Sequence, residues 1–241
     1  MTNGGGYFKA KKARQMEAIL RDGVSIPSDR MCRSHTPMRA LARQHGQDLV
    51  LAVGKDCADR GTVLTTYGFQ HVVTVDQLDR HVPAMYPDVH VLEPLDHQGH
   101  FDLHAFRAVF VRIDPIVLKP RTPDCHGCPL LPERTRRTTH RTRRWHANMC
   151  PFTRPARISR TWSDFHLPRD GAGAFHALLE TLFTRTTGHK LQETLYGKPQ
   201  RTSFAFAATL LDAQYDAVER IYMVGDKPHT DIYGAKQAGG R

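Results

Sequence analysis

Apolar residues occur along the chain in two patterns, which are short continuous runs, typical of strands, and helical spacing, typical of helices. Short apolar runs predict strands at 48–53 and 72–75 and a buried strand at 108–115. Helical spacing of apolar residues predicts helices at 7–22, 38–44, 55–67, 175–187 and 203–211. A fourth apolar run, at 221–224, predicts another buried strand. Alternating strands and helices are typical of a mostly parallel sheet flanked by helices, so the predicted fold class is α/β.

The strongest chemical signal lies in the last fifth of the chain. Lys198 lies in a Gly-Lys-Pro loop, and the 221–224 run ends at Gly225 and Asp226, with Asp231 five residues later. A lysine in a loop can neutralise phosphate charge, and two carboxylates at the carboxyl end of a strand lie where open α/β sheets keep their ligands. Such oxygen ligands suit Mg²⁺. A strand, a turn and a helix capped by Thr230 or Asp231 would show the same pattern without any chemistry.

Several segments resemble one hydrolase superfamily. They are TNGGG at 2–6, SHTPMRAL at 34–41, YGFQHVVTVDQL at 67–78, LPRDGAGAFHALLE at 167–180 and LYGKPQ at 195–200. Together they resemble the haloacid dehalogenase-like (HAD) hydrolases of the class IIA capped subgroup, near the relatives of the cat eye syndrome critical region protein and their fungal mitochondrial counterparts. The resemblance covers 1–115 and 163–241, and it implies a Rossmann-like HAD core with an inserted α/β cap domain.

The resemblance also implies an activity and a set of site residues. The activity is Mg²⁺-dependent hydrolysis of a small phosphate ester through an aspartyl-phosphate. Thr2 and Asn3 would hold the phosphoryl oxygens, and Lys198 would be the catalytic cation that stabilises charge on nucleophile and phosphate. Asp226 and Asp231 would be the metal residues, with Asp226 ligating Mg²⁺ and Asp231 orienting the metal shell or Lys198. The expected location is the mitochondrion.

One part of the superfamily's machinery does not occur in the sequence. The nucleophile of these hydrolases is the first Asp of a DxDG motif on a strand before the TN motif, and no Asp-x-Asp occurs in the 241 residues. Covalent catalysis requires that carboxylate. We therefore expect a chain truncated at both ends, a fragment or incomplete gene model, that is inactive as written. A non-catalytic scaffold with the same fold is the alternative.

The resemblance predicts a discontinuous core, 1–33 and 173–241, with a cap at 34–172. Within the cap, the segment 118–162 differs from both flanks, because it is rich in Arg, Thr and Pro and shows neither apolar period. We expect this anomalous segment to be disordered, and a shifted reading frame or an unspliced intron would explain its abrupt start and end.

The net charge of +10 comes mostly from this same segment. Residues 119–160 hold eleven Lys or Arg and only two acids, which leaves a net charge of only +1 for the rest of the chain. We therefore expect no nucleic-acid partner for the folded part. A competing interpretation is a zinc module at 119–160 that binds nucleic acid, with finger-like spacing of Cys125, Cys128, His146 and Cys150. The chain shows no secretory signal and no apolar run of the ~20 residues that a membrane span needs, so the sequence predicts an intracellular soluble protein with a small phosphorylated substrate.

Overall fold

The protein consists of two compact units. The computed structural model describes residues 1–3, 8–20, 23–54, 63–81, 105–111, 146–149, 160–161, 169–170 and 172–239. The first unit is Met1–Ala40, Cys150–Gly173 and Leu195–Arg241, and the second is Leu41–Met149 and Ala174–Thr194. Within the described ranges, no helix is both long and apolar enough to cross a membrane.

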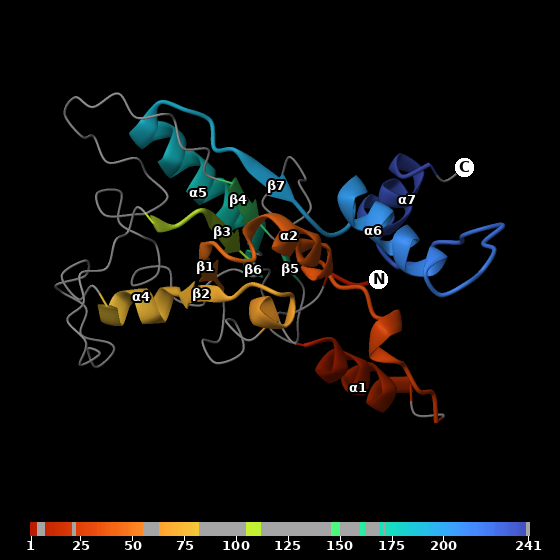
Figure 1. Ribbon diagram of the computed structural model, residues 1–241. Helices are drawn as coiled ribbons and strands as arrows, with labels where there is room; N and C mark the ends of the chain where they lie inside the picture. The colour runs from red at the N-terminus through yellow and green to blue at the C-terminus, as the bar shows by residue number, and fades with distance from the viewer. Residues whose placement is uncertain are drawn as a thin grey trace. The chain divides into compact units, whose positions relative to one another are not determined.

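A five-stranded sheet forms the centre of the second unit (Figure 1). Its strand order is β2-β1-β3-β4-β7, and the β1–β2, β1–β3 and β3–β4 pairs are all parallel. The strands are β1 (Leu49–Val53), β2 (His71–Thr74), β3 (Ala108–Val111), β4 (His146–Met149) and β7 (Glu193–Leu195). The first three match the predicted runs at 48–53, 72–75 and 108–115, and the predicted α/β class is confirmed.

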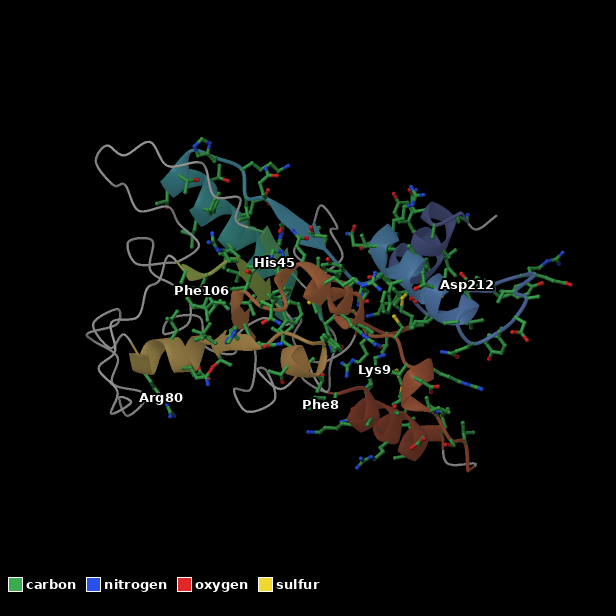
Figure 2. All side chains as sticks on the ribbon, in the orientation of Figure 1. Phe8, Lys9, His45, Arg80, Phe106 and Asp212 are labelled. Carbon is green, nitrogen blue, oxygen red and sulfur yellow. The ribbon has the colours of Figure 1, made fainter. Side chains whose placement is uncertain are left out.

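Burial of the two central strands explains why their sequences are continuous apolar runs. The side chains of Val50 and Phe110 are fully buried, as expected for strands covered on both faces. Phe110 contacts Phe69 edge to face, with ring centroids 4.8 Å apart. Phe106, labelled in Figure 2, is only 2% exposed just before β3. These contacts fix the sheet of the second unit.

Two helices of the second unit accompany the sheet. Helix α4 (Val75–His81) follows β2 directly and packs against β2 and β1. Helix α5 (Ala172–Thr187) matches the helix predicted at 175–187. Phe175 and Phe183 on α5 are buried, but Leu178 and Leu182 on the predicted apolar face are 49% and 39% exposed. The buried stripe of α5 is therefore narrower than its apolar stripe.

The remaining helices are short, and most were predicted. Those at 7–22 and 203–211 are α1 (Lys9–Leu20) and α6 (Arg201–Asp212). The segment predicted as one helix at 38–44 is η2 (Thr36–Leu41) followed by α2 (Ala42–His45), and only 63–66 of the helix predicted at 55–67 lies within the described residues. The others are η1 (Ser28–Arg30), η5 (Pro228–Ile232) and α7 (Tyr233–Gln237).

The buried strand predicted at 221–224 is wrong. The segment forms no strand, and Ile221, Tyr222 and Val224 are 57%, 76% and 90% exposed. An apolar run becomes a strand only when a neighbouring strand satisfies its backbone groups. Among the described residues of the first unit, no strand pairs with this segment, so it stays exposed.

Short strands lie in the segment 118–162, where the apolar pattern predicts none. They are β4, which pairs with β3, and β5 (Arg160–Thr161), which pairs antiparallel with β6 (Arg169–Asp170). These strands form because neighbouring strands bond to their backbone groups, and not because their own sequence has an apolar period. Cys125, Cys128 and Cys150 of the zinc hypothesis lie outside the described residues.

Candidate functional site

The lysine loop of the first unit is a tight turn immediately before α6. Gly197 has a φ of 93°, a left-handed conformation that glycine adopts without steric cost. The Gln200 N–H donates to the Gly197 carbonyl at 2.7 Å, and the Gly197 N–H donates to the hydroxyl of Ser203, which is fully buried. These bonds place the backbone of Lys198 at the entrance to α6.

The side chain of Lys198 forms an ion pair with Asp231, 33 residues later. The Lys198 and Asp231 side chains are 13% and 1% exposed, so the aspartate is buried and the lysine side chain keeps a small exposed part. The Lys198 ammonium donates to Oδ1 of Asp231. Oδ2 accepts from the Lys227 N–H at 3.3 Å and from the Thr230 hydroxyl at 3.1 Å. Both carboxylate oxygens of Asp231 therefore have donors.

The electrostatics of Asp231 follow from these contacts. Burial alone raises the pKa of the carboxyl group, because it disfavours the charged form. The hydrogen bond and charge of Lys198, together with the hydrogen bonds from Thr230 and the Lys227 N–H, outweigh burial and hold the pKa below its ordinary value of 3.8. Asp231 is thus an anion at neutral pH, and it anchors the lysine cation.

Close backbone approach explains the glycines around Asp231. A Cβ atom at Gly225 would lie 2.2 Å from Cγ of Asp231, and one at Gly234 would lie 2.3 Å from Cε2 of Phe204. The expected capping of the following helix by Thr230 or Asp231 is wrong, because Ile232 occupies the cap position of α7 and Lys227 that of η5, and neither has a side-chain cap hydrogen bond. The Thr230 hydroxyl instead contacts the Lys227 carbonyl and Asp231.

The two predicted metal residues have different environments. Asp231 is buried against Lys198, whereas Asp226 is exposed to solvent at the end of the 221–224 segment. The sequence treats the two as one pair at the end of a buried strand, but that strand does not form. Among the residues that the structure describes, no three His, Cys, Asp or Glu side chains cluster closely enough to hold a metal ion.

The N-terminal residues join the same site. The Thr2 N–H donates to the Cys32 carbonyl at 3.0 Å, and the Thr2 carbonyl accepts from the Ser34 N–H at 3.1 Å. The carboxamide of Asn3 then bonds both backbone groups of Lys198: Nδ2 donates to the carbonyl and Oδ1 accepts from the N–H, each at 2.8 Å. The structure therefore brings together Asn3, Lys198 and Asp231, three of the five predicted site residues.

Sequence reasoning missed the contact between Asn3 and the Lys198 backbone, and it missed the role of Thr230. The first contact joins residues 195 positions apart, for which one sequence carries no signal. Thr230 directly precedes Asp231, and a hydroxyl beside a buried carboxylate was the available clue.

A wide groove of 1210 Å³ lies elsewhere in the first unit. Its walls include Phe204, Ala208 and Leu211 of α6, Ala235 of α7 and the exposed Tyr222. Neither Lys198 nor Asp231 lines it. The groove is more apolar than polar and does not include the ion pair, so the candidate site is the Asn3–Lys198–Asp231 cluster and not this groove.

Comparison with known proteins connects this cluster to one superfamily. Residues 195–241, which hold the lysine loop and both aspartates, match the family described as HAD-hydrolase-like. The chain is 31% identical, over 99% of its length, to a cardiolipin synthase (CMP-forming)/mitochondrial hydrolase fusion protein of Schizosaccharomyces pombe, of which it spans only 40%. It is 25% identical to a mitochondrial hydrolase of Saccharomyces cerevisiae, covering 99% of this chain and 74% of that protein.

The solved structures agree at the level of the fold. A possible sugar phosphatase of the HAD superfamily from Cytophaga hutchinsonii matches with a TM-score of 0.60 at 16% identity, covering 96% of this chain and 66% of that one. Sequence and fold comparisons together confirm the resemblance that the motifs predict, and the chain is related to the HAD-like hydrolases.

Proposed function

We propose that the first unit carries the phosphate-binding part of a HAD-type phosphatase site whose substrate is a small phosphate ester. The observation that carries this proposal is the buried Asp231 carboxylate, which holds the ammonium group of Lys198, a side chain that is 13% exposed. A positioned cation costs no reorganisation when negative charge develops on a transferring phosphoryl group. The relation to HAD-like hydrolases, among them a possible sugar phosphatase, supports the same reaction class.

In this proposal each site residue has a separate role. Lys198 neutralises charge on the phosphoryl group. Thr2 and Asn3 complete the phosphoryl-binding end, Thr2 from a backbone that pairs with the residues around Arg33. Asp231 orients Lys198 through their ion pair. Asp226 is exposed at the end of its segment and is the residue that would ligate a metal ion.

The donor set fits Mg²⁺ with one direct carboxylate. Mg²⁺ usually takes one or two protein carboxylates and completes its shell with water and substrate phosphate. Asp226 is exposed and suits that role, while both oxygens of Asp231 already accept hydrogen bonds within the protein. Mg²⁺ would supply charge neutralisation on the phosphate. Asp231 would then contribute to the site by orienting Lys198.

The 241 residues contain no Asp-x-Asp, so the chain as written holds no residue in the position of the superfamily's nucleophile. We therefore propose that it binds phosphate without turnover. In the same proposal, 1–33 and 173–241 form the core and 34–172 the cap that selects the substrate. A mitochondrial location is supported by the names of the two curated relatives.

The test combines binding and turnover. Titration of the expressed chain with inorganic phosphate and Mg²⁺, followed by ³¹P NMR, should show saturable binding that weakens at least about tenfold in Lys198→Ala, the loss of one charge-assisted contact. Hydrolysis of p-nitrophenyl phosphate by the unmodified chain should be no faster than hydrolysis by Lys198→Ala. Phosphate binding that is unchanged in Lys198→Ala would refute the site. Mg²⁺-dependent turnover that Lys198→Ala abolishes would instead show that the chain is catalytic as written.

A further inference from the structure

The Asn3 carboxamide makes a two-point contact with the backbone of a single distant residue. Oδ1 accepts from the Lys198 N–H and Nδ2 donates to the Lys198 carbonyl, both at 2.8 Å. The Lys198 N–H can only donate and its carbonyl can only accept, so the orientation of the carboxamide is fixed by its partners. One side chain thus makes the two backbone hydrogen bonds that a residue of a neighbouring strand would make.

Asn3 can hold Lys198 because its own backbone is anchored. Thr2, the residue before it, forms a parallel bridge with Arg33, through the Cys32 carbonyl on one side and the Ser34 N–H on the other. The side chains of Arg33 and Ser34 are 0% and 5% exposed, so this anchor lies in the interior of the first unit. Asn3 therefore extends from a fixed point.

Lys198 is consequently restrained at both ends. Asn3 holds its backbone, and Asp231 holds its ammonium group. The Asn3 carboxamide has already used its only acceptor and one of its two N–H donors on Lys198. Asn3 therefore provides the position of the lysine loop, in addition to its place at the phosphoryl-binding end.

We propose that Asn3 is a positioning residue, which sets the Lys198 cation for phosphate binding by holding the backbone of the lysine loop. The inference rests on the proposed phosphate site, which it deepens. A cationic group must lie close to its productive geometry, and small displacements reduce its effect on the phosphate. Loss of the Asn3 contact should therefore weaken phosphate binding although the charge of the site is unchanged.

The variants follow from the geometry. Asn3→Leu has a similar size and no charge, but it can neither donate nor accept. Asn3→Asp keeps an acceptor for the Lys198 N–H and loses the donor to the carbonyl. Gln237→Leu is the matched control, because Gln237 is an exposed amide residue at the end of α7.

The first readout is hydrogen exchange of the Lys198 amide, followed by mass spectrometry on peptides that cover 196–200. Asn3→Leu should speed this exchange about tenfold, the effect of losing one or two hydrogen bonds of typical net strength, with β1 as an internal reference. Asn3→Asp should retain most of the protection, and Gln237→Leu all of it. Unchanged exchange in Asn3→Leu would refute the contact, whether or not the chain binds phosphate.

The second readout is the affinity for inorganic phosphate. Asn3→Leu should weaken it about tenfold, and Gln237→Leu should leave it unchanged. The positioning role is refuted if Asn3→Leu exchanges faster at Lys198 but binds phosphate as tightly as wild type, while Lys198→Ala binds it weakly. If Lys198→Ala itself binds normally, the proposed function fails and the positioning role fails with it, while the exchange result still decides whether Asn3 holds the loop.

Discussion

Replacement of Asp231 by Asn tests the electrostatic core of the site. The substitution keeps the shape of the side chain and removes its charge. Asn retains one oxygen for the Thr230 hydroxyl and the Lys227 N–H, and its amide group then faces the Lys198 ammonium group, so two donors oppose each other. The lysine, at 13% exposure, is left without its anionic partner.

The expected cost is about 3 kcal/mol of the unfolding free energy of the first unit. Removing one partner of a buried ion pair costs about 3–5 kcal/mol, and the lower figure applies because Lys198 can still reach water. Lys198→Met should cost at least as much, because it leaves the nearly fully buried carboxylate uncompensated. The double variant should cost less than the sum of the two, with a coupling of about 2 kcal/mol.

The assay must report on the first unit alone, because the chain has two units. Native-state hydrogen exchange of the α6 amides as a function of urea gives the opening free energy of that unit. Asp216→Asn is the matched control, since Asp216 is an exposed carboxylate of the same unit. The reasoning is refuted if Asp231→Asn stays within about 0.5 kcal/mol of wild type, the range of ordinary surface substitutions. Additive costs of the two single variants would refute the ion pair itself.

Three further changes have outcomes fixed by local geometry. Gly225→Ala should destabilise the first unit by about 1–3 kcal/mol, as overpacking does, because its Cβ would lie 2.2 Å from Cγ of Asp231; urea unfolding measures this cost, and an unaffected protein would contradict the close approach. Gly234→Ala should cost a similar amount because of the Phe204 ring at 2.3 Å, and Phe204→Leu should restore part of the stability in the double variant. Burial raises the pKa of the Cys32 thiol above its ordinary value of 9.0. Its contribution to stability is therefore complete below pH 9 and is lost as the pH rises through the folded-state pKa, at up to about 1.4 kcal/mol per pH unit. Between pH 7 and 11 the free energy of unfolding of wild type should fall relative to that of Cys32→Ala, and parallel curves would contradict this shift.

The sequence by itself determined the parts of the fold that depend on local pattern. Strands β1 and β3 are continuous apolar runs that are buried where they pair, and β2 carries two valines between His71 and Thr74, so their positions follow from the local pattern of apolar residues. The helices α5 and α6 follow from apolar spacing in the same way. The lysine loop and the two aspartates were also readable, because the chemistry of each residue type is local.

Tertiary structure decided which of these patterns found partners. The run at 221–224 reads like β1, yet it is exposed, since a strand needs a neighbour that no local sequence supplies. Asp226 and Asp231 are five residues apart and chemically identical, but only Asp231 is buried, because Lys198 compensates its charge. The Asn3 contact joins positions 195 residues apart. Hydrogen bonds and ion pairs of this kind depend on distances in space, and a single sequence records only distances along the chain.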